Sequence, residues 1–309
     1  MSRGVYIVAN EKVADNAIAL LASLRLHDPE VPVYLIPFDQ NYQQVFETLH
    51  RLYQVKLFPD LAFLESLTQK IGEIFPRDFL ALPNKMRKLA TWFGPLEEFL
   101  YIDTDILFFE PVSDTLAYLD EADFICCDYH FKGRKLRDVF ASAAIEQGIF
   151  PAEIVQDVFN SGLWGSKKSA LSLSQLHERL QECAQHREYF DFAGGTTDQP
   201  IMNYLVLKTI PHRLNITQVN PDETGSWGGM SHFQERDHML YDGDRRLRYL
   251  HWAGTPMRPG GPYRSLWEYY RYLDDDTPRT KPNPSGKWAV PTLPRFNRWM
   301  KRLRQTLKT

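Results

Sequence analysis

The apolar residues in the first half of the chain fall into two alternating patterns. Residues 5–9 (VYIVA) form an unbroken apolar run rich in β-branched residues, as in a strand that is buried on both faces. Over residues 13–26 the apolar positions recur at helical spacing, and residues 31–38 (VPVYLIPF) predict a second strand. A strand, a helix and a strand in succession predict a βαβ unit.

The same alternation continues further along the chain. We expect a helix near residues 41–52 and strands at 55–58, 99–103 and 123–127. Alternating strands and helices predict an α/β fold with a mostly parallel sheet and helices on both faces. Ligands of such sheets bind beyond the carboxyl ends of the strands, so polar side chains that follow a strand are the first candidates for a site.

The second half of the chain is less regular. The expected elements are a strand within 159–166, a helix over about 169–186, a helix from residue 198, a glycine-rich loop at 220–233 and a strand at 249–254. Within the loop, the glycines of 225–229 are candidate hinges of a lid, and Trp227 is a candidate platform for a sugar ring. Trp252, Tyr263 and Trp267 are further aromatic candidates, for which core packing is the alternative.

Two aspartates interrupt the apolar run FLYIDTDILFF at residues 99–109. Asp103 and Asp105 stand at the end of an expected strand, where an extended backbone directs residues i and i+2 to one face. Two poorly solvated carboxylates do not both stay ionised without a cation, and oxygen ligands suit Mg²⁺ or Mn²⁺. Such a cation would neutralise the phosphates of a diphosphate leaving group. The alternative is a turn with capping carboxylates.

His251 can complete this metal site. It lies in the expected strand YLHWAG, three residues before Gly254, where the backbone can approach a phosphate closely. An imidazole beside carboxylates would favour Mn²⁺ over Mg²⁺. The alternative for a lone histidine is a structural position in the core or on the surface.

Charge and composition narrow the partners and the compartment. The formal net charge of −3 over 309 residues does not favour a nucleic-acid partner. Three cysteines, two of them adjacent, argue against a disulfide framework and favour a reduced, cytoplasmic compartment. The N-terminus lacks the apolar stretch of a signal peptide, and no run approaches the length of a membrane span.

Taken in order, the motifs resemble those of a known enzyme group. They are Ala9-Asn10, NKMRKL (84–89), DTD (103–105), FNSG (159–162), DQPIMN (198–203) and HWAG (251–254). The chain resembles nucleotide-sugar-dependent glycosyltransferases of the GT-A fold. It is most similar to glycosyltransferase family 8, the glycogenin-like and bacterial galactosyltransferase group. The resemblance implies a nucleotide-diphospho-sugar transferase fold with a Rossmann-like central sheet.

The resemblance also implies a role for each matching position. Ala9 and Asn10 would line the nucleotide pocket, Lys85 would reach the donor phosphates, and Gly254 would pack on the diphosphate, with Arg258 as a further phosphate clamp. Asp103 would meet the ribose and the metal, and Asp105 and His251 the metal. Asn160 and Ser161 would hold the donor sugar, and Asp198 and Gln199 would lie beside the anomeric carbon. For these positions the alternatives are ordinary turn, cap and first-turn residues.

The reaction implied is a metal-dependent, retaining transfer of one sugar from a nucleoside-diphosphate sugar, with UDP-hexose favoured and Mn²⁺ or Mg²⁺ as cofactor. The acceptor would be an unidentified hydroxyl on a carbohydrate or glycolipid. Asp198 or Gln199 would be the group nearest the chemistry, as nucleophile or as stabiliser of an oxocarbenium-like transition state.

Two other functions stay open for this chain. One is a sugar-nucleotide-binding or scaffold protein that kept the fold and lost turnover. The other is a phosphatase with a DxD motif, although Leu107 stands where such enzymes need Thr or Val.

We expect a single catalytic domain over residues 1–275, with a nucleotide-binding half (1–128) and an acceptor-side half (129–275). Residues 276–294 would be a proline-rich linker, followed by a basic amphipathic helix at 295–309. The 295–308 segment can lie on an anionic membrane surface or dock on protein, so peripheral membrane contact is one expectation.

Overall fold

The fold was analysed in a computed structural model, which describes residues 2–127, 139–190, 198–221, 225–255, 257 and 259–274. The chain divides into two units, Met1–Asp274 and Asp275–Thr309. The second unit holds the predicted linker and basic helix, which lie outside the described residues. No helix among the described residues is both long enough and apolar enough to cross a membrane.

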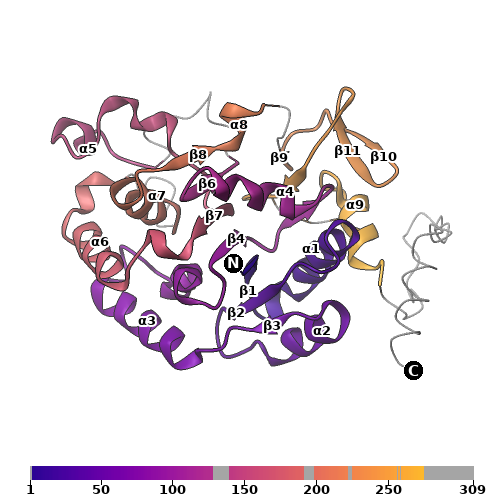
Figure 1. The fold of residues 1–309 in the computed structure, drawn as a ribbon, viewed down its shortest axis with the longest axis horizontal. Helices are drawn as coiled ribbons and strands as arrows, with labels where there is room; N and C mark the ends of the chain where they lie inside the picture. The colour runs from indigo at the N-terminus through magenta and orange to yellow at the C-terminus, as the bar shows by residue number, and fades with distance from the viewer. Residues whose placement is uncertain are drawn as a thin grey trace. The chain divides into compact units, whose positions relative to one another are not determined.

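A seven-stranded sheet forms the centre of the first unit (Figure 1), and its strand order is β3-β2-β1-β4-β7-β6-β8. Its strands are β1 (Arg3–Ala9), β2 (Val33–Pro37), β3 (Lys56–Leu57), β4 (Glu98–Ile102), β6 (Phe124–Cys126), β7 (Leu163–Lys167) and β8 (Arg213–Asn215). Only β7 runs antiparallel to its neighbours, β4 and β6. The prediction of a mostly parallel sheet is therefore confirmed.

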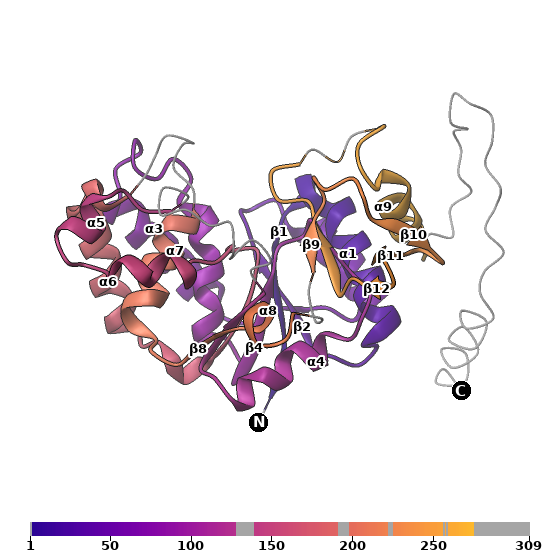
Figure 2. The ribbon, with the colours of Figure 1, turned by 90° about the horizontal axis from the view of Figure 1, so that it is seen from above.

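Helices cover both faces of this sheet. They are α1 (Ala14–His27), α2 (Gln43–Tyr53), α3 (Leu61–Ile74), α4 (Val112–Ala117), α5 (Ala143–Glu146), α6 (Leu173–Gln185), α7 (Asp198–Thr209), α8 (Ile216–Val219) and α9 (Arg264–Arg271). Figure 2 shows α3, α6 and α7 on one side of the sheet and α1 and α9 on the other. Short 3₁₀ segments lie at Glu11–Val13, Pro83–Phe93, Tyr118–Asp120, Ala152–Gln156, Lys168–Ala170 and Arg187–Tyr189.

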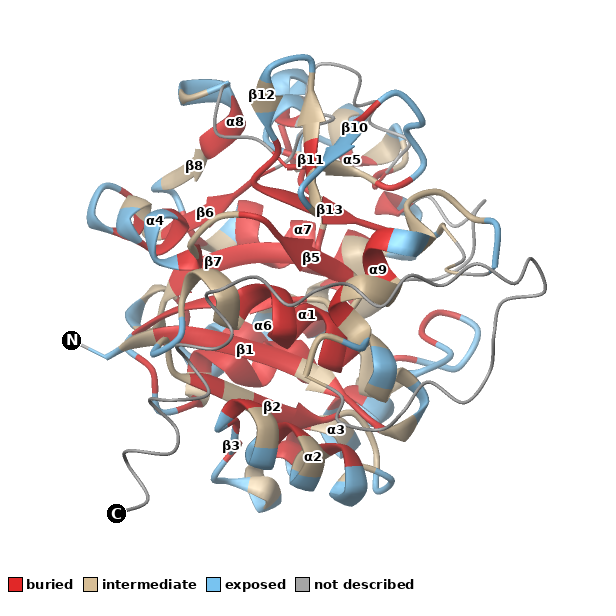
Figure 3. Cartoon of the chain, turned by 90° about the vertical axis from the view of Figure 1, so that its right-hand side faces the viewer, coloured by how far each residue is buried: buried red, intermediate tan, exposed pale blue. Residues whose placement is uncertain are grey.

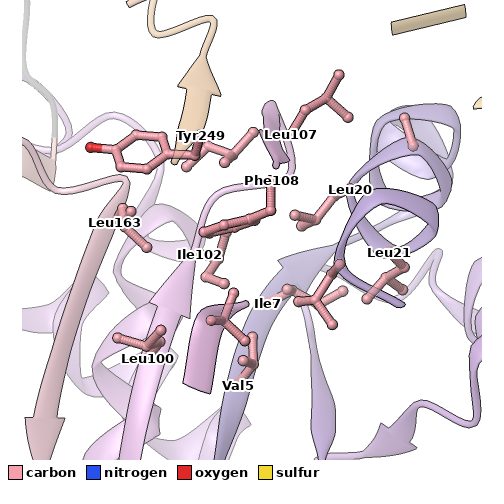
Figure 4. Close-up of a cluster of buried hydrophobic side chains, with 14 of the residues drawn as sticks. Val5, Ile7, Leu20, Leu21, Leu100, Ile102, Leu107, Phe108, Leu163 and Tyr249 are labelled. Atoms are coloured by element: carbon pink, nitrogen blue, oxygen red, sulfur yellow. The ribbon is translucent and has the colours of Figure 1, made fainter. Parts of the chain in front are cut away.

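The period of two along the strands builds a separate apolar core on each face. Val5 and Ile7 of β1 pack with α1 and α2, whereas Tyr6 points to the core formed by α3, α6 and α7. Figure 4 shows the first core, in which Leu20 of α1 lies near Phe108, and Figure 3 shows that the strands of the sheet are mostly buried. A strand buried on both faces is the arrangement that an unbroken apolar run predicts.

Two three-stranded sheets complete the unit. One is β5-β13-β9, formed by β5 (Ile106–Phe108), β13 (Tyr249–His251) and β9 (Ser226–Trp227). The other is β10-β11-β12, formed by β10 (Gln234–Arg236), β11 (Met239–Asp242) and β12 (Arg245–Arg246). Antiparallel pairing sets His251 opposite Ile106. The pairing of β5 with β13 therefore brings the histidine, distant in sequence, to the aspartates that precede β5.

Candidate active site

The two aspartates lie in the short connection between β4 and β5. The backbone N–H of Asp103 donates to the carbonyl of Gly162 (2.7 Å), the last residue of the FNSG motif, directly before β7. The carbonyl of Asp105 accepts from the backbone N–H of Trp252 (3.0 Å). These backbone bonds hold the connection to the segments that contain the FNSG and HWAG motifs.

Asp103, Asp105 and His251 form a compact group of candidate metal ligands. Each offers one ligand atom, and these atoms lie within 4.8 Å of one another. Nε2 of the buried His251 lies 3.2 Å from Oδ1 of Asp105. One imidazole nitrogen and two carboxylates are a donor set that fits Mn²⁺, and Mg²⁺ less well because of the nitrogen.

Gly162 provides the space in which this group converges. A Cβ at this position would lie 2.9 Å from Oδ2 of Asp103 and 2.9 Å from Nε2 of His251, and closer still to Cε1 of the same ring. Any side chain here would displace the candidate ligands, so the glycine of FNSG is required by the site itself.

A third carboxylate, paired with a buried lysine, lies next to the group of candidate metal ligands. Nζ of Lys88 lies 2.6 Å from Oδ2 of Asp198 at the start of α7 and 3.6 Å from Oδ1 of Asp103. It also donates to the carbonyl of Ser161 (3.2 Å). One lysine therefore links the candidate metal site to the carboxylate of the DQPIMN motif.

Tyr101 contacts both Asp103 and Lys88. Its hydroxyl donates to Oδ1 of Asp103 at 2.5 Å, and Nζ of Lys88 lies 4.6 Å from its ring centroid. The ring stacks on Trp164 of β7, with centroids 5.4 Å apart. Tyr101 and Asp103 are two residues apart, and both point to the same side of the chain, as residues i and i+2 of a strand do.

Burial and nearby charges shift the pKa values of the three carboxyl groups in different directions. Burial raises the pKa of Asp103; the charge of Lys88 opposes this shift, and the charges of Asp105 and Asp198 reinforce it. For Asp105 burial is outweighed by the hydrogen bond and charge of His251, so its pKa is lowered. For Asp198 burial is outweighed by the charge and hydrogen bond of Lys88, and its pKa is also lowered.

The basic and phenolic groups of the cluster are held in their ordinary protonation states. Burial alone would lower the pKa of Lys88, but the charges of Asp103 and Asp198 outweigh it and raise the pKa. Burial and the charge of Asp103 raise the pKa of Tyr101 well above its ordinary value. At neutral pH the lysine is an ammonium and the tyrosine is a neutral hydrogen-bond donor.

Side-chain hydrogen bonds join the FNSG and DQPIMN motifs. Ser161 donates its hydroxyl to Oδ2 of Asp198 (3.0 Å), and its backbone N–H donates weakly to Oε1 of Gln199 (3.4 Å). Asn160 accepts at Oδ1 from the backbone N–H of Gly162 (2.9 Å), which closes the turn before β7.

Asn203, one turn further along α7, strengthens this junction. Its side-chain amide bonds both the N–H and the carbonyl of Phe159, each at 2.9 Å, and also reaches the carbonyl of Gln199. Asn203 is fully buried. The amide of Asn203 therefore adds to the bonds of Ser161 that hold the two motifs together.

The predicted nucleotide-binding residues lie at the end of β1. Asn10 is buried; its Oδ1 accepts from the backbone N–H of Lys12, and its Nδ2 donates to Asp39 (2.7 Å). Ala9 is buried beside Pro37 at the carboxyl end of β2. Lys85 is half-buried, and no described residue pairs with its side chain. The carboxyl end of β1, beside that of β2, therefore holds the two residues proposed for the nucleotide pocket, Ala9 and Asn10.

The segment after β13 carries the remaining predictions. Gly254 adopts a positive φ of 65°, which favours glycine, in a turn closed by the N–H of Thr255 and the carbonyl of Trp252. Strand β13 accordingly ends at His251, earlier than the expected strand through residue 254. Arg258 lies outside the described residues.

The aromatic candidates are mainly structural. Trp252 and Trp267 are buried in the core. Trp227 is half-buried and donates its indole N–H to the carbonyl of Ala253 (2.8 Å), and Tyr263 donates its hydroxyl to the carbonyl of Met230 (2.7 Å). The indole of Trp227 is thus fixed to the turn beside His251.

Lys88, Tyr101 and Asn203 are site residues that the sequence analysis did not single out. Each lies inside or beside a motif that was recognised, and a signal for one of them was present. Tyr101 precedes Asp103 by two residues and so shares its side of the strand.

The chain resembles known proteins in its fold. No model of a known protein family matches the sequence, and no curated protein matches it. Among solved structures, the galactosyltransferase LgtC in complex with donor and acceptor sugar analogues is similar, with a TM-score of 0.60 and 11% identity over 89% of this chain and 98% of that one.

Two further glycosyltransferases show the same likeness. Mouse xyloside xylosyltransferase 1 matches with a TM-score of 0.53 and 16% identity, over 83% of this chain and 99% of that one. The bifunctional glycosyltransferase WbbM matches with a TM-score of 0.54 and 13% identity over 90% of this chain, which spans half of the WbbM chain. The chain therefore has the GT-A fold of the glycosyltransferases, as its ordered motifs predict.

Proposed function

We propose that this protein is a metal-dependent glycosyltransferase that moves one sugar from a nucleoside-diphosphate sugar to an acceptor hydroxyl. The observation that carries the proposal is the convergence of Asp103, Asp105 and His251 beside the Lys88–Asp198 pair, within a GT-A fold. Family 8 membership, a UDP-hexose donor, retention of configuration and a carbohydrate or glycolipid acceptor belong to the proposal, since the resemblance of the motifs implies them.

The candidate ligands fit a divalent cation at the diphosphate end of the site. Asp103, Asp105 and His251 would hold Mn²⁺, or Mg²⁺, which supplies charge neutralisation for the departing nucleoside diphosphate. Lys85 and Gly254 would contact the phosphates, and Arg258 would add a planar guanidinium for the same purpose. The nucleoside would lie against Ala9 and Asn10 at the end of β1.

The donor sugar would lie between Asp103 and α7. Lys88 and Ser161 both donate to Oδ2 of Asp198, which leaves Oδ1 as the oxygen for the reacting centre. Because its pKa is lowered, Asp198 is ionised at neutral pH and can act as nucleophile or stabilise positive charge at the anomeric carbon. Gln199 would lie beside the anomeric carbon with Asp198, and Asn160 and Ser161 would hold the donor sugar.

Slow donor hydrolysis tests this proposal. Purified full-length protein would receive a panel of UDP-, GDP-, CDP-, ADP- and dTDP-sugars with and without Mn²⁺, and release of nucleoside diphosphate would be followed. We expect release from one donor that depends on Mn²⁺ and is lost in Asp105→Ala.

The same assay separates the competing functions. Mn²⁺-dependent nucleotide binding without turnover would support the sugar-nucleotide-binding protein instead. Release of inorganic phosphate from phosphomonoesters would support the phosphatase. Absence of both turnover and Mn²⁺-dependent binding would overturn the metal site. It would support the alternative, in which the two aspartates are capping residues of a turn.

A further inference from the structure

We infer that Tyr101 is a positioning residue that commits one oxygen of Asp103 to the protein and leaves the other for the cation. By restricting Asp103 to a single ligand oxygen, Tyr101 would favour small octahedral cations such as Mn²⁺ over Ca²⁺. This inference deepens the proposed function, because it rests on the same metal site.

The hydroxyl of Tyr101 has a fixed position because its ring is held by packing. The ring is buried and stacks on Trp164, whose own ring stacks on Trp92 with centroids 4.6 Å apart. Nζ of Lys88 lies over the Tyr101 ring. A ring packed in this way cannot follow Asp103 if the carboxylate turns, so it sets the direction of its hydrogen bond.

That hydrogen bond engages Oδ1 of Asp103. Tyr101 donates to Oδ1 at 2.5 Å, and Nζ of Lys88 lies 3.6 Å from the same oxygen. Tyr101 and Lys88 are buried, whereas the side chain of Asp103 is 34% exposed. Oδ1 therefore faces two donors of the protein.

Oδ2 of Asp103 faces the other way. It and Nε2 of His251 border the space that the missing side chain of Gly162 leaves. Among the described residues, no hydrogen-bond donor reaches this oxygen. Tyr101, Lys88 and Gly162 together divide the carboxylate into a protein-bound oxygen and a ligand oxygen.

This division affects which cation the site prefers. Ca²⁺ takes six to eight oxygen ligands and commonly uses both oxygens of a carboxylate, whereas Mg²⁺ needs near-ideal octahedral geometry with shorter bonds. A carboxylate that offers one oxygen in a set direction suits the smaller ion. Groups that orient metal ligands typically change metal affinity about 10- to 100-fold when they are removed.

Tyr101→Phe tests this role, because it removes the hydroxyl and retains the ring that packs on Trp164. Mn²⁺ binding to the full-length protein without donor would be titrated by electron paramagnetic resonance, and Ca²⁺ would be added as competitor. We expect the Kd for Mn²⁺ to rise about 10-fold while the Kd for Ca²⁺ stays constant or falls, so that the preference for Mn²⁺ drops about 10-fold.

Tyr6→Phe is the matched control. Tyr6 is equally buried, and its hydroxyl accepts from the backbone N–H of Leu96 (3.0 Å), outside the candidate site. This variant should lose some thermal stability and keep the wild-type Kd for both ions. A purely structural effect of losing a buried hydroxyl would affect both variants alike.

The outcomes distinguish this inference from the proposed function. Unchanged Mn²⁺ affinity and unchanged preference in Tyr101→Phe, with Mn²⁺ binding lost in Asp105→Ala, would overturn the role of Tyr101 and leave the metal site standing. Absence of Mn²⁺ binding in the wild type would overturn the metal site, and this inference with it.

Discussion

Two sets of carboxylates lie side by side in this protein, Asp103 with Asp105 and Asp198 alone, and their negative charges are balanced in different ways. The group of Asp103 and Asp105 has one histidine and shares in one lysine, and the pKa of Asp103 is raised. Asp198 has a lysine at 2.6 Å and a serine hydroxyl at 3.0 Å, and its pKa is lowered. The first group needs a further cation, whereas the second is neutralised by the protein itself.

The difference in charge balance agrees with two different roles in the proposed reaction. A group with excess negative charge is a site for a cation and for the diphosphate that the cation would hold. A carboxylate already paired and ionised is poised for an anomeric centre that becomes positive. Lys88 touches both groups, so the comparison is best tested by changing this lysine first.

Replacing Lys88 with methionine should have the largest effect on stability. The side chains are similar in volume, but the variant leaves the largely buried Asp198 without its ammonium partner, and removing one partner of a buried pair typically destabilises a protein by about 3–5 kcal/mol. Chemical denaturation at neutral pH would measure the change in the free energy of unfolding. A loss below about 1 kcal/mol would show that Asp198 does not depend on this pair.

The same variant should show a distinct pH dependence. Because the folded-state pKa of Asp198 is lowered, its pairing stabilises the wild type above the unfolded pKa of about 3.9, and this contribution is lost as pH falls through the folded pKa. In Lys88→Met the unpaired carboxyl protonates more readily. The difference in unfolding free energy between the two proteins should therefore narrow on acidification below neutral pH, and a constant difference would contradict the assignment to Asp198.

The fold was predictable because its signal is local and repeated. The run at residues 5–9 and the helical spacing of 13–26 correspond to β1 and α1. His251 was a candidate ligand from its residue type, but local pattern could not place it beside the aspartates, because β13 joins β5 through a pairing between residues far apart in sequence. Periodicity within a segment contains no information about such a pairing.

The lysine of the site shows why the rest was not predictable. Lys85 and Lys88 occupy the same motif, and the resemblance implied Lys85 as the residue that reaches the phosphates. The segment forms 3₁₀ turns from Pro83 to Phe93, and only Lys88 is buried against carboxylates. Which lysine of a pair is buried depends on how the segment packs against α7, which lies more than a hundred residues later.

The glycine of FNSG offers a test of the metal side alone. Gly162→Ala adds a Cβ that would meet Asp103 and His251, so we expect the Mn²⁺ affinity to fall about 10- to 100-fold. Gly72→Ala, at an exposed position in α3 with ordinary contact distances, is the control and should leave Mn²⁺ binding unchanged. Equal Mn²⁺ affinity in both variants would show that the candidate ligands do not depend on the absence of a side chain at Gly162.

The smallest effect on stability should come from replacing Lys85, and this change tests whether the two lysines have different functions. Side chains three residues apart in a 3₁₀ segment lie on the same side, so Lys85 lies one turn before Lys88. Lys85 is half-buried and has no partner among the described residues, so Lys85→Met should change stability by less than about 0.5 kcal/mol.

If Lys85 binds the donor phosphates, the same variant should raise the KM for the donor about 10-fold, equivalent to one charge-assisted hydrogen bond of about 1.4 kcal/mol. In Lys88→Met the loss of stability should be the larger of the two effects. Steady-state kinetics and denaturation of both variants would measure the two effects together. An unchanged KM in Lys85→Met would remove this residue from the phosphate site and leave Lys88 as the lysine of the motif that matters for the reaction.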